Sequence, residues 1–369
     1  TDSSSFAFAT TITGFFKFNS CSLEDSTSST CINKNIAATA HFDACPEKIA
    51  IRRPGENRRE LSRAINLGPS RRIPILWLMR SISLTCFFAS FATVRLFAWD
   101  YEGHRAVNLT ALASLPVEFP AFVRSDAARE RIAFLSGEPD RWRNVPQDLP
   151  LKHASSPDHF IDFEDLEPLG LTTATLSDFR HVYTSQIFLA RAAHPERFPA
   201  IDPEKNKDRT RELPGYLPWT IAESYARLKS AFSYLKAYEE AGTPDEIANA
   251  QANIIYLMGV MGHYVGDGSQ PLHTTKHYNG WVGENPQSFT TARTFHAWID
   301  GGFLAKSGGL SVPSLIQAVK PASRLATTVS ASGRDPIFEH ALNYLSSHFT
   351  QVVPLYQLDK LGKLSPEKP

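Results

Sequence analysis

Histidine and aspartate residues that could bind a metal ion recur at helical spacing in the second half of the chain. His263 and Asp267 stand four residues apart at the end of a predicted helix, and His273 follows Gly268 and Pro271. A separation of four residues places two side chains on one face of a helix, about one turn apart. Imidazole and carboxylate groups that converge in this way are typical zinc ligands. This stretch therefore predicts a zinc site at a helix terminus.

A second pair with the same spacing, His296 and Asp300, lies further along the chain. Taken alone, such a pair is more often a hydrogen bond on a helix face than a metal site. The cysteines all lie in the first 86 residues, at Cys21, Cys31, Cys45 and Cys86. A metal site in the rest of the chain must therefore be built from His, Asp, Glu and backbone atoms.

The composition is that of a globular protein, with 42% hydrophobic and 21% charged residues among 369 and a formal net charge of +0. This length suffices for one large domain or two small ones. A neutral balance provides no electrostatic argument for a long nucleic-acid footprint or for an anionic membrane surface. A small site for phosphate esters is still compatible with it, because bound metal ions supply positive charge.

The N-terminal part differs from the rest. Residues 1–78 contain no methionine and show no helical or strand period, so we expect them to be a disordered upstream extension of the reading frame. Met79, Arg80 and the apolar run that ends at Ala98 have the pattern of a signal peptide over residues 79–98, which predicts a secreted or periplasmic protein. The alternative is an uncleaved anchor, but the run is short for a membrane span and contains Arg95.

Cleavage after Ala98 would make Trp99 the new N-terminus. A free α-amino group and the carbonyl of the same residue can chelate a metal ion, and His104 follows a few residues later.

Residues 99–369 are expected to form an all-α, single multi-helix domain. Apolar residues recur with a helical period, and Thr243 followed by Pro244 and Glu246 is a strong helix start. The predicted helices cover residues 105–115, 122–135, 176–193, 219–241, 243–267, 311–326 and 336–350, and residues 137–140 are expected to form a turn.

Five elements in a fixed order resemble one known superfamily. They are Trp99 followed by His104, Asp140 in Pro-Asp-Arg-Trp-Arg, His159 in His-Phe-Ile-Asp, the run from His263 to His273, and the pair His296 and Asp300. The resemblance is to single-strand-specific zinc nucleases (nuclease S-one and P-one type) and zinc-dependent bacterial phospholipases C. It covers Trp99 to about Lys306 and implies an all-helical fold that binds three zinc ions.

The resemblance also implies a ligand set. One zinc ion would be held by Asp140, His159, His263 and Asp267. A second would be held by the Trp99 amino nitrogen and carbonyl oxygen, by His104, and by Asp267 as a bridge. A third would be held by His273, His296 and Asp300. Asp140, His263 and Asp267 are the residues expected to be central to catalysis, which would be hydrolysis of a phosphate ester by a zinc-bridged hydroxide.

Other residues near the motifs have weaker roles. Asp158 and Asp162 flank His159 and could orient an imidazole. Lys276, Tyr278 and Trp281 follow His273 and are candidates for substrate binding, where an aromatic ring could stack on a base.

The substrate is either single-stranded DNA or RNA, or a phospholipid head group. Trp-x4-His, His-Phe-Ile-Asp, the long gap before His296 and the closing aspartate favour a nuclease. The Gly-Gly-Asn element that such nucleases carry in this gap is absent, and Thr294-Phe295 stands where they have Asn-Leu. A Pro-Asp…Asp-His-Phe pattern fits a phospholipase C. A secreted zinc-binding protein without catalysis is the third reading. No protein partner is indicated, and no transmembrane segment remains after signal cleavage.

Overall fold

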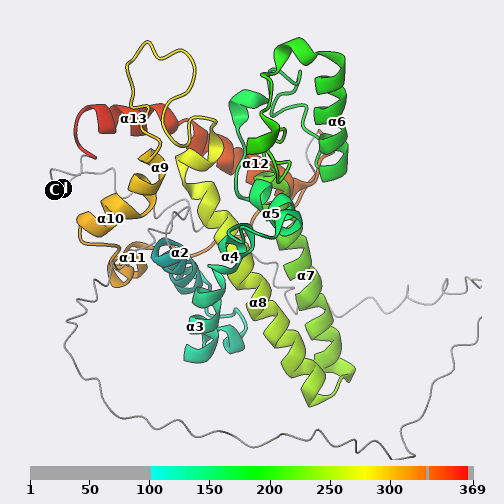
Figure 1. Ribbon diagram of the computed structural model, residues 1–369. Helices are drawn as coiled ribbons and strands as arrows, with labels where there is room; N and C mark the ends of the chain where they lie inside the picture. Colours follow the sequence, from blue (N-terminus) through cyan, green and yellow to red (C-terminus); the bar gives the residue numbers. More distant parts are fainter. Residues whose placement is uncertain (1–100, 330–331, 365–369) are drawn as a thin grey trace, which may run out of the picture. The chain divides into compact units, whose positions relative to one another are not determined.

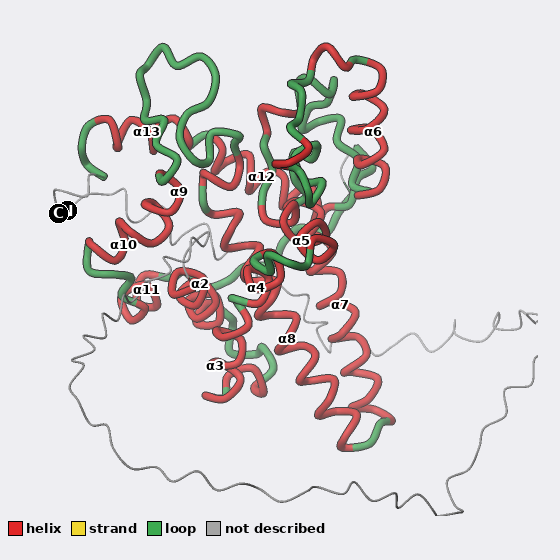
Figure 2. The backbone as a smooth tube through the Cα atoms, viewed as in Figure 1, coloured by secondary structure: helices red, strands yellow, loops and turns green. Residues whose placement is uncertain are grey.

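The structure is a computed structural model that describes residues 101–329 and 332–364, so Trp99, the predicted extension and the predicted signal peptide lie outside the described residues. The described residues contain helices and no strand, which confirms the all-α fold (Figures 1 and 2). The α-helices are α2 (Tyr101–Ser114), α3 (Asp126–Leu135), α4 (Glu138–Arg143), α5 (Leu149–Ser155), α6 (Arg180–Ala193), α7 (Leu217–Ala241), α8 (Pro244–Ser269), α9 (Phe295–Ala297), α10 (Phe303–Lys306), α11 (Val312–Ala318), α12 (Pro336–Phe349) and α13 (Val352–Lys360).

Shorter helical turns connect these helices. The 3₁₀ turns are η1 (Ala121–Arg124), η2 (Ser156–His159), η3 (Phe163–Asp165), η4 (Pro195–Arg197), η5 (Pro203–Lys205) and η6 (Pro271–Thr274), and η7 (Trp298–Gly302) is a π-helical turn between α9 and α10. None of the helices in the described ranges is long and apolar enough to cross a membrane.

Helices α7 and α8 form an antiparallel pair that runs side by side in Figure 1. Their connection is Gly242-Thr243, and a capping box starts α8. The Thr243 backbone N–H donates to Glu246 Oε2 at 2.8 Å, and the Glu246 backbone N–H donates to Thr243 Oγ1 at 3.3 Å. These bonds satisfy backbone donors that a helix start leaves without partners, so α8 begins where the sequence predicted.

The C-terminal half of α8 is buried from Met258 to Ser269, because α2, α3 and α12 pack around it. Asn108 of α2 joins three of these helices. Its Nδ2 donates to the Ile132 carbonyl of α3 at 2.9 Å and to the Gly259 carbonyl of α8 at 3.1 Å. A Cβ atom at Gly262 would lie 1.7 Å from Asn108 Oδ1. Only glycine therefore permits this close approach of α2 to α8.

A second, smaller hydrophobic cluster fixes the long segment before α9. Tyr356 of α13 is its centre, and the ring centroids of Trp281, Phe289 and Phe295 lie 5.3, 5.4 and 4.6 Å from it. The Tyr356 hydroxyl donates to the His277 carbonyl. Residues 277–294, which contain no helix, are thus held against the body of the protein at both ends.

Three local predictions were wrong. Residues 137–140 are not a turn, because Glu138–Arg143 forms α4 with Asp140 in its first turn. The helix predicted over residues 311–326 ends at Ala318, since Pro321 disfavours helix in the preceding residue and the Ala322 N–H instead donates to the Ser114 carbonyl at 2.8 Å. The helix predicted from residue 176 begins at Arg180, because the Ser177 carbonyl accepts a hydrogen bond from Trp219 Nε1 at 3.0 Å.

The Asn108 junction provides a test of what holds α2, α3 and α8 together. Asn108→Ala removes two buried hydrogen bonds, so we expect the free energy of unfolding to fall by about 1–3 kcal/mol. The measurement is urea denaturation followed by circular dichroism. Asn253→Ala, at an exposed position of α8, is the matched control and should be neutral or slightly stabilising. Equal effects of the two substitutions would contradict this role of Asn108.

Candidate metal centre

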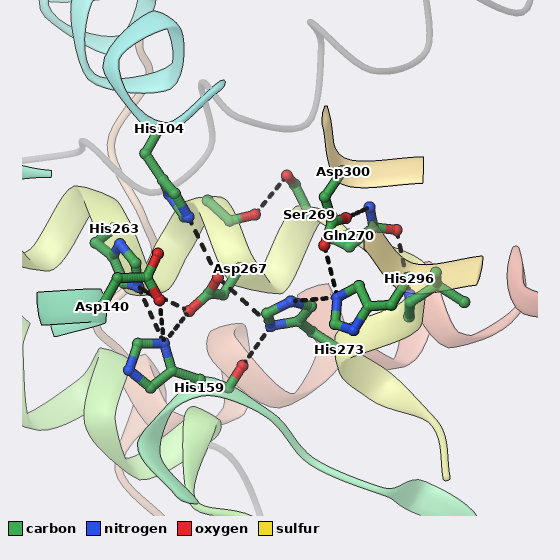
Figure 3. Close-up of polar contacts among 12 residues, drawn as sticks. His104, Asp140, His159, His263, Asp267, Ser269, Gln270, His273, His296 and Asp300 are labelled. Carbon is green, nitrogen blue, oxygen red and sulfur yellow. Dashed lines mark hydrogen bonds and ion pairs between the residues drawn. The ribbon is translucent and has the colours of Figure 1, made fainter. Parts of the chain in front are cut away.

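The end of α8 carries the residues that the sequence singled out. His263 and Asp267 lie one turn apart on its buried face, α8 ends at Ser269, and His273 lies in η6. Figure 3 shows that their side chains point toward one another and toward residues from α2, α4, η2 and the α9–η7 segment. The i, i+4 spacing thus places both side chains on one face of α8, and the other elements add candidate ligands from distant parts of the chain.

The most compact group consists of His159, His263 and Asp267, all fully buried. His159 Nδ1 lies 3.0 Å from His263 Nε2 and 2.9 Å from Asp267 Oδ2, and His263 Nε2 lies 3.1 Å from the same oxygen. Neighbouring ligands of a tetrahedral zinc ion lie about 3.3 Å apart, since zinc–ligand distances are about 2.0–2.1 Å. The three atoms therefore fit around one ion of this size. Asp140 Oδ1, 3.9–4.0 Å from both nitrogens, is a nearby fourth donor.

His104 belongs to a neighbouring group with Asp140 and His263. Its Nε2 lies 3.5 Å from Asp267 Oδ1, the oxygen that faces away from His159. The His104 ring stacks on the His263 ring with centroids 3.9 Å apart. Asp267 Oδ1 accepts no hydrogen bond among the described residues although it is buried. A buried carboxylate oxygen without a donor is unfavourable, and a cation between the two groups would satisfy it.

The third group consists of His273, His296 and Asp300. His296 Nε2 lies 3.2 Å from His273 Nε2 and 2.7 Å from Asp300 Oδ2. Asp300 lies in the π-helical turn η7, a type of turn that is frequent at functional sites. These distances again fit one ion, so the described residues contain three groups that could hold metal ions.

Backbone carbonyls orient two of the imidazoles. His263 Nδ1 donates to the Ser136 carbonyl at 2.6 Å, and His273 Nδ1 donates to the His159 carbonyl at 2.7 Å. A carbonyl can only accept, so each Nδ1 carries the proton and each Nε2 presents a lone pair to its group. This arrangement is what metal-binding histidines need.

Burial sets the protonation of the centre. It lowers the pKa of His263 to about 4 and lowers the pKa of His159 and His273 well below the ordinary value, so these rings are neutral near pH 7. Burial also raises the pKa of Asp267 well above that of an exposed carboxyl. For Asp140 burial acts in the same direction, but the positive charge of Arg143 and its hydrogen bond to Asp140, with the electrostatic effect of His263 and His104, outweigh it and lower the pKa.

Comparison with known proteins identifies no relative of this chain. No family model, no curated protein and no solved structure matches the chain. What the centre can do therefore rests on its own geometry.

A cleft of roughly 580 Å³, which we call the central cleft, opens beside the third group. Phe160, Tyr278 and Arg143 line it together with all three members of that group. His296 has a 19% exposed side chain, whereas His104, His159 and His263 are inaccessible. A ligand in the cleft would thus meet the third group first.

The structure places the other predicted residues as follows. Tyr278 lines the central cleft, and its ring lies 5.7 Å from that of His296. Lys276 lines a neighbouring cavity, and Trp281 stacks on His277 at 3.8 Å inside the second hydrophobic cluster. Asp158 does not orient an imidazole, because it pairs with Arg180 at 2.6 Å. Among the described residues, Asp162 has no hydrogen bond to His159.

Two residues that donate hydrogen bonds to the carboxylates of the centre were not predicted from the sequence. Arg143 donates to Asp140 Oδ1 at 2.7 Å, and Gln270 Nε2 donates to Asp300 Oδ1 at 2.6 Å. The spacing of Asp140 and Arg143 on one helix could have indicated the first. The second joins Gln270, between α8 and η6, to Asp300 of η7 across 30 residues, and no local sequence pattern predicts it.

Gln270 allows a test of the third group. Gln270→Leu removes the donor that holds the Asp300 carboxylate, so we expect metal affinity at one of the three groups to fall by about 10–100-fold. Competition with a chromophoric chelator measures this, and Gln357→Leu, at an exposed position of α13, is the matched control. Unchanged affinity at every group would contradict the role of Gln270.

Proton release tests the electrostatics of the centre. Because burial raises the pKa of Asp267, the metal-free protein retains a proton on this carboxyl at pH values where exposed carboxyls are ionised. A divalent cation must displace that proton, so we expect its affinity to fall as the pH is lowered. Titration calorimetry in buffers of different ionisation enthalpy measures the released protons. Asp267→Asn should release fewer, and equal release from both proteins would refute the assignment.

Proposed function

We propose that the chain is a secreted, zinc-dependent phosphodiesterase that cleaves single-stranded nucleic acid. The observation that carries the proposal is the convergence of three groups of His and Asp residues around Asp267, next to a cleft lined by cations and aromatic rings. The order of the motifs from Trp99 to Asp300 supports the same family resemblance.

The residues present fit zinc better than a harder cation. Each group contains at least one imidazole, and magnesium and calcium prefer oxygen ligands alone. Asp140, His159, His263 and Asp267 would hold one ion. The Trp99 amino nitrogen and carbonyl oxygen, His104 and Asp267 would hold a second, and His273, His296 and Asp300 a third. Bound zinc supplies an acidified water molecule and positive charge for phosphate oxygens.

The protein's own residues supply position and charge. Asp267 presents one oxygen to His159 and His263 and the other to His104, so it fixes the first two groups relative to each other. The carbonyls of Ser136 and His159 hold the rings of His263 and His273 in one tautomer. Arg143, partly exposed in the central cleft, adds a fixed positive charge where negative charge would develop on a phosphate.

The lining of the central cleft favours a nucleotide over a plain phosphate ester. Lys152, Lys205, Arg211 and Arg293 surround it together with Arg143, and they outnumber the acidic side chains other than Asp300. The rings of Phe160 and Tyr278 offer faces on which a base can stack. Bases of single strands are accessible to such rings, whereas bases in a duplex are already stacked.

One observation supports a phospholipid as the second candidate substrate. Helix α6 exposes large apolar side chains, with Phe179 just before it 70% exposed, Leu189 69% and Phe188 50%. An apolar helix face of this kind can lie on a lipid surface.

The deciding experiment is hydrolysis by zinc-loaded protein that begins at Trp99. We expect single-stranded DNA and RNA to be cleaved, a chelator to abolish cleavage, and Asp267→Asn to lower kcat/KM by at least about 10³-fold through loss of the shared ligand. Asp245→Asn, at an exposed position in the first turn of α8, is the matched control and should retain activity.

The alternatives predict different results in the same assay. Cleavage of phosphatidylcholine vesicles without cleavage of nucleic acid would favour the phospholipase. Zinc bound at all three groups without hydrolysis of any phosphodiester would favour a non-catalytic zinc-binding protein.

A further inference from the structure

A second cavity of roughly 700 Å³, which we call the side cavity, adjoins the central cleft. Four residues, Asp165, Lys205, Arg211 and Leu213, line both spaces. The two spaces are therefore neighbours that share one wall. None of the residues in the three metal-binding groups lines the side cavity.

The side cavity is rich in basic side chains. Arg191, Arg197, Lys205, Arg211 and Lys276 line it, against the acidic residues Asp165, Asp202 and Glu212. Such a surplus of cations in a concave surface attracts an anion, because low-dielectric walls strengthen the field inside it.

The basic side chains of the side cavity differ in whether they form an ion pair with a carboxylate. Lys205 pairs with Asp202 at 3.4 Å, and Arg197 lies 3.8 Å from Glu196. In contrast, Arg191, Arg211 and Lys276 form no ion pair with any described residue, although the carboxylates of Glu212 and Asp165 lie near enough to Arg191 to favour its charged form. Arg191 and Arg211 are held by other contacts. Their Nε atoms donate to backbone carbonyls, of Glu212 at 3.3 Å and of Lys205 at 2.7 Å. Each guanidinium is thus held in place by a neutral partner, and its outer N–H groups remain suited to a phosphate.

The remaining lining suits a nucleotide. Leu169, Phe198 and Ile201 provide apolar walls, and the Arg191 guanidinium lies 4.4 Å from the centroid of the Phe198 ring. A space of several hundred Å³ with apolar walls and a few fixed polar groups is typical of a small-molecule or nucleotide site. A free inorganic anion would leave most of that apolar surface unused.

We propose that the side cavity binds the phosphate backbone of a single-stranded nucleic acid away from the bond that is cleaved. The inference rests on the proposed nuclease function and extends it, because it assigns a second contact with the bound strand outside the metal-binding groups. A strand whose scissile phosphate lies at the central cleft would pass the shared wall at Arg211 and place a further phosphate near Arg191. Dinucleotides, too short to reach Arg191, would be cleaved less efficiently than longer strands.

The test compares two substrates of different length. Zinc-loaded wild-type protein and Arg191→Gln are assayed with a thymidine dinucleotide and with a 12-residue oligothymidylate. We expect Arg191→Gln to lower kcat/KM for the 12-mer by at least about fivefold, through a higher KM, and to leave the dinucleotide within about twofold. The slope of log KM against log salt for the 12-mer should fall by about 0.7 for the lost phosphate contact.

Two further variants control for charge and folding. Arg191→Lys retains the positive charge and should retain the salt slope, even where it loses part of the affinity. Arg227→Gln removes an exposed arginine of α7 that lines neither the central cleft nor the side cavity. It should leave kcat/KM unchanged for both substrates. Binding of a fluorescein-labelled 12-mer to chelator-treated protein, followed by anisotropy, gives the same comparison without catalysis.

The outcomes separate the two proposals. If the wild-type protein cleaves both substrates and Arg191→Gln cleaves each as well as the wild type does, the side-cavity inference is wrong and the nuclease function stands. An equal loss of kcat/KM on both substrates also refutes the inference, since it would mean that Arg191 affects folding or catalysis in general. If neither substrate is cleaved by wild-type protein, the proposed function itself fails.

Discussion

Asp267 is a fully buried carboxylate whose oxygens face the imidazoles of residues on three other elements, and the rest of the centre depends on how that charge is compensated. Burial of a carboxylate without a charged partner costs several kcal/mol. His159 and His273 do not supply the charge, because burial keeps them neutral, whereas burial raises the pKa of Asp267 and His104 electrostatically opposes that rise. Arg143 lies beside Asp140 rather than Asp267. Without a cation, burial favours the protonated carboxyl, and a cation held by these groups could stabilise the ionised form instead.

The helices must approach one another closely for these residues to meet. On α8, Gly259, Gly262 and Gly266 recur at intervals of three and four residues, which places them on one face toward α2 and α3. A Cβ atom at Gly266 would lie 3.0 Å from His104 Nδ1. The small residues thus leave the space into which His104 reaches, and Asn108 closes the polar junction beside it. The glycines of α8 therefore allow both the close packing of the helices and the approach of the candidate metal ligands.

Much of this could be predicted from sequence where the signal is local. The helical period and the capping box at Thr243 fix α7 and α8, and the i, i+4 spacing places His263 and Asp267 on one face. The convergence of His104, Asp140 and His159 on that face was expected only through the resemblance. It depends on tertiary contacts such as the Asn108 hydrogen bonds, which no spacing encodes. The early end of α11 has the same origin, since a distant carbonyl at Ser114 competes for its backbone.

The groups differ in depth, and this difference indicates a division of roles. His104, His159 and His263 are fully buried, so the packing of the elements that carry them, α2, η2 and α8, sets their geometry. His296 and Asp300 come from the segment α9–η7, which the Tyr356 cluster and a few hydrogen bonds, including one from Gln270 to Asp300, hold in place. A molecule that enters through the central cleft would meet His296 first. His296 belongs to the third group, which is the one least constrained by the core. Under the proposed function, the rigid groups would hold the nucleophile, whereas the third group would be the one that adjusts to a bound substrate.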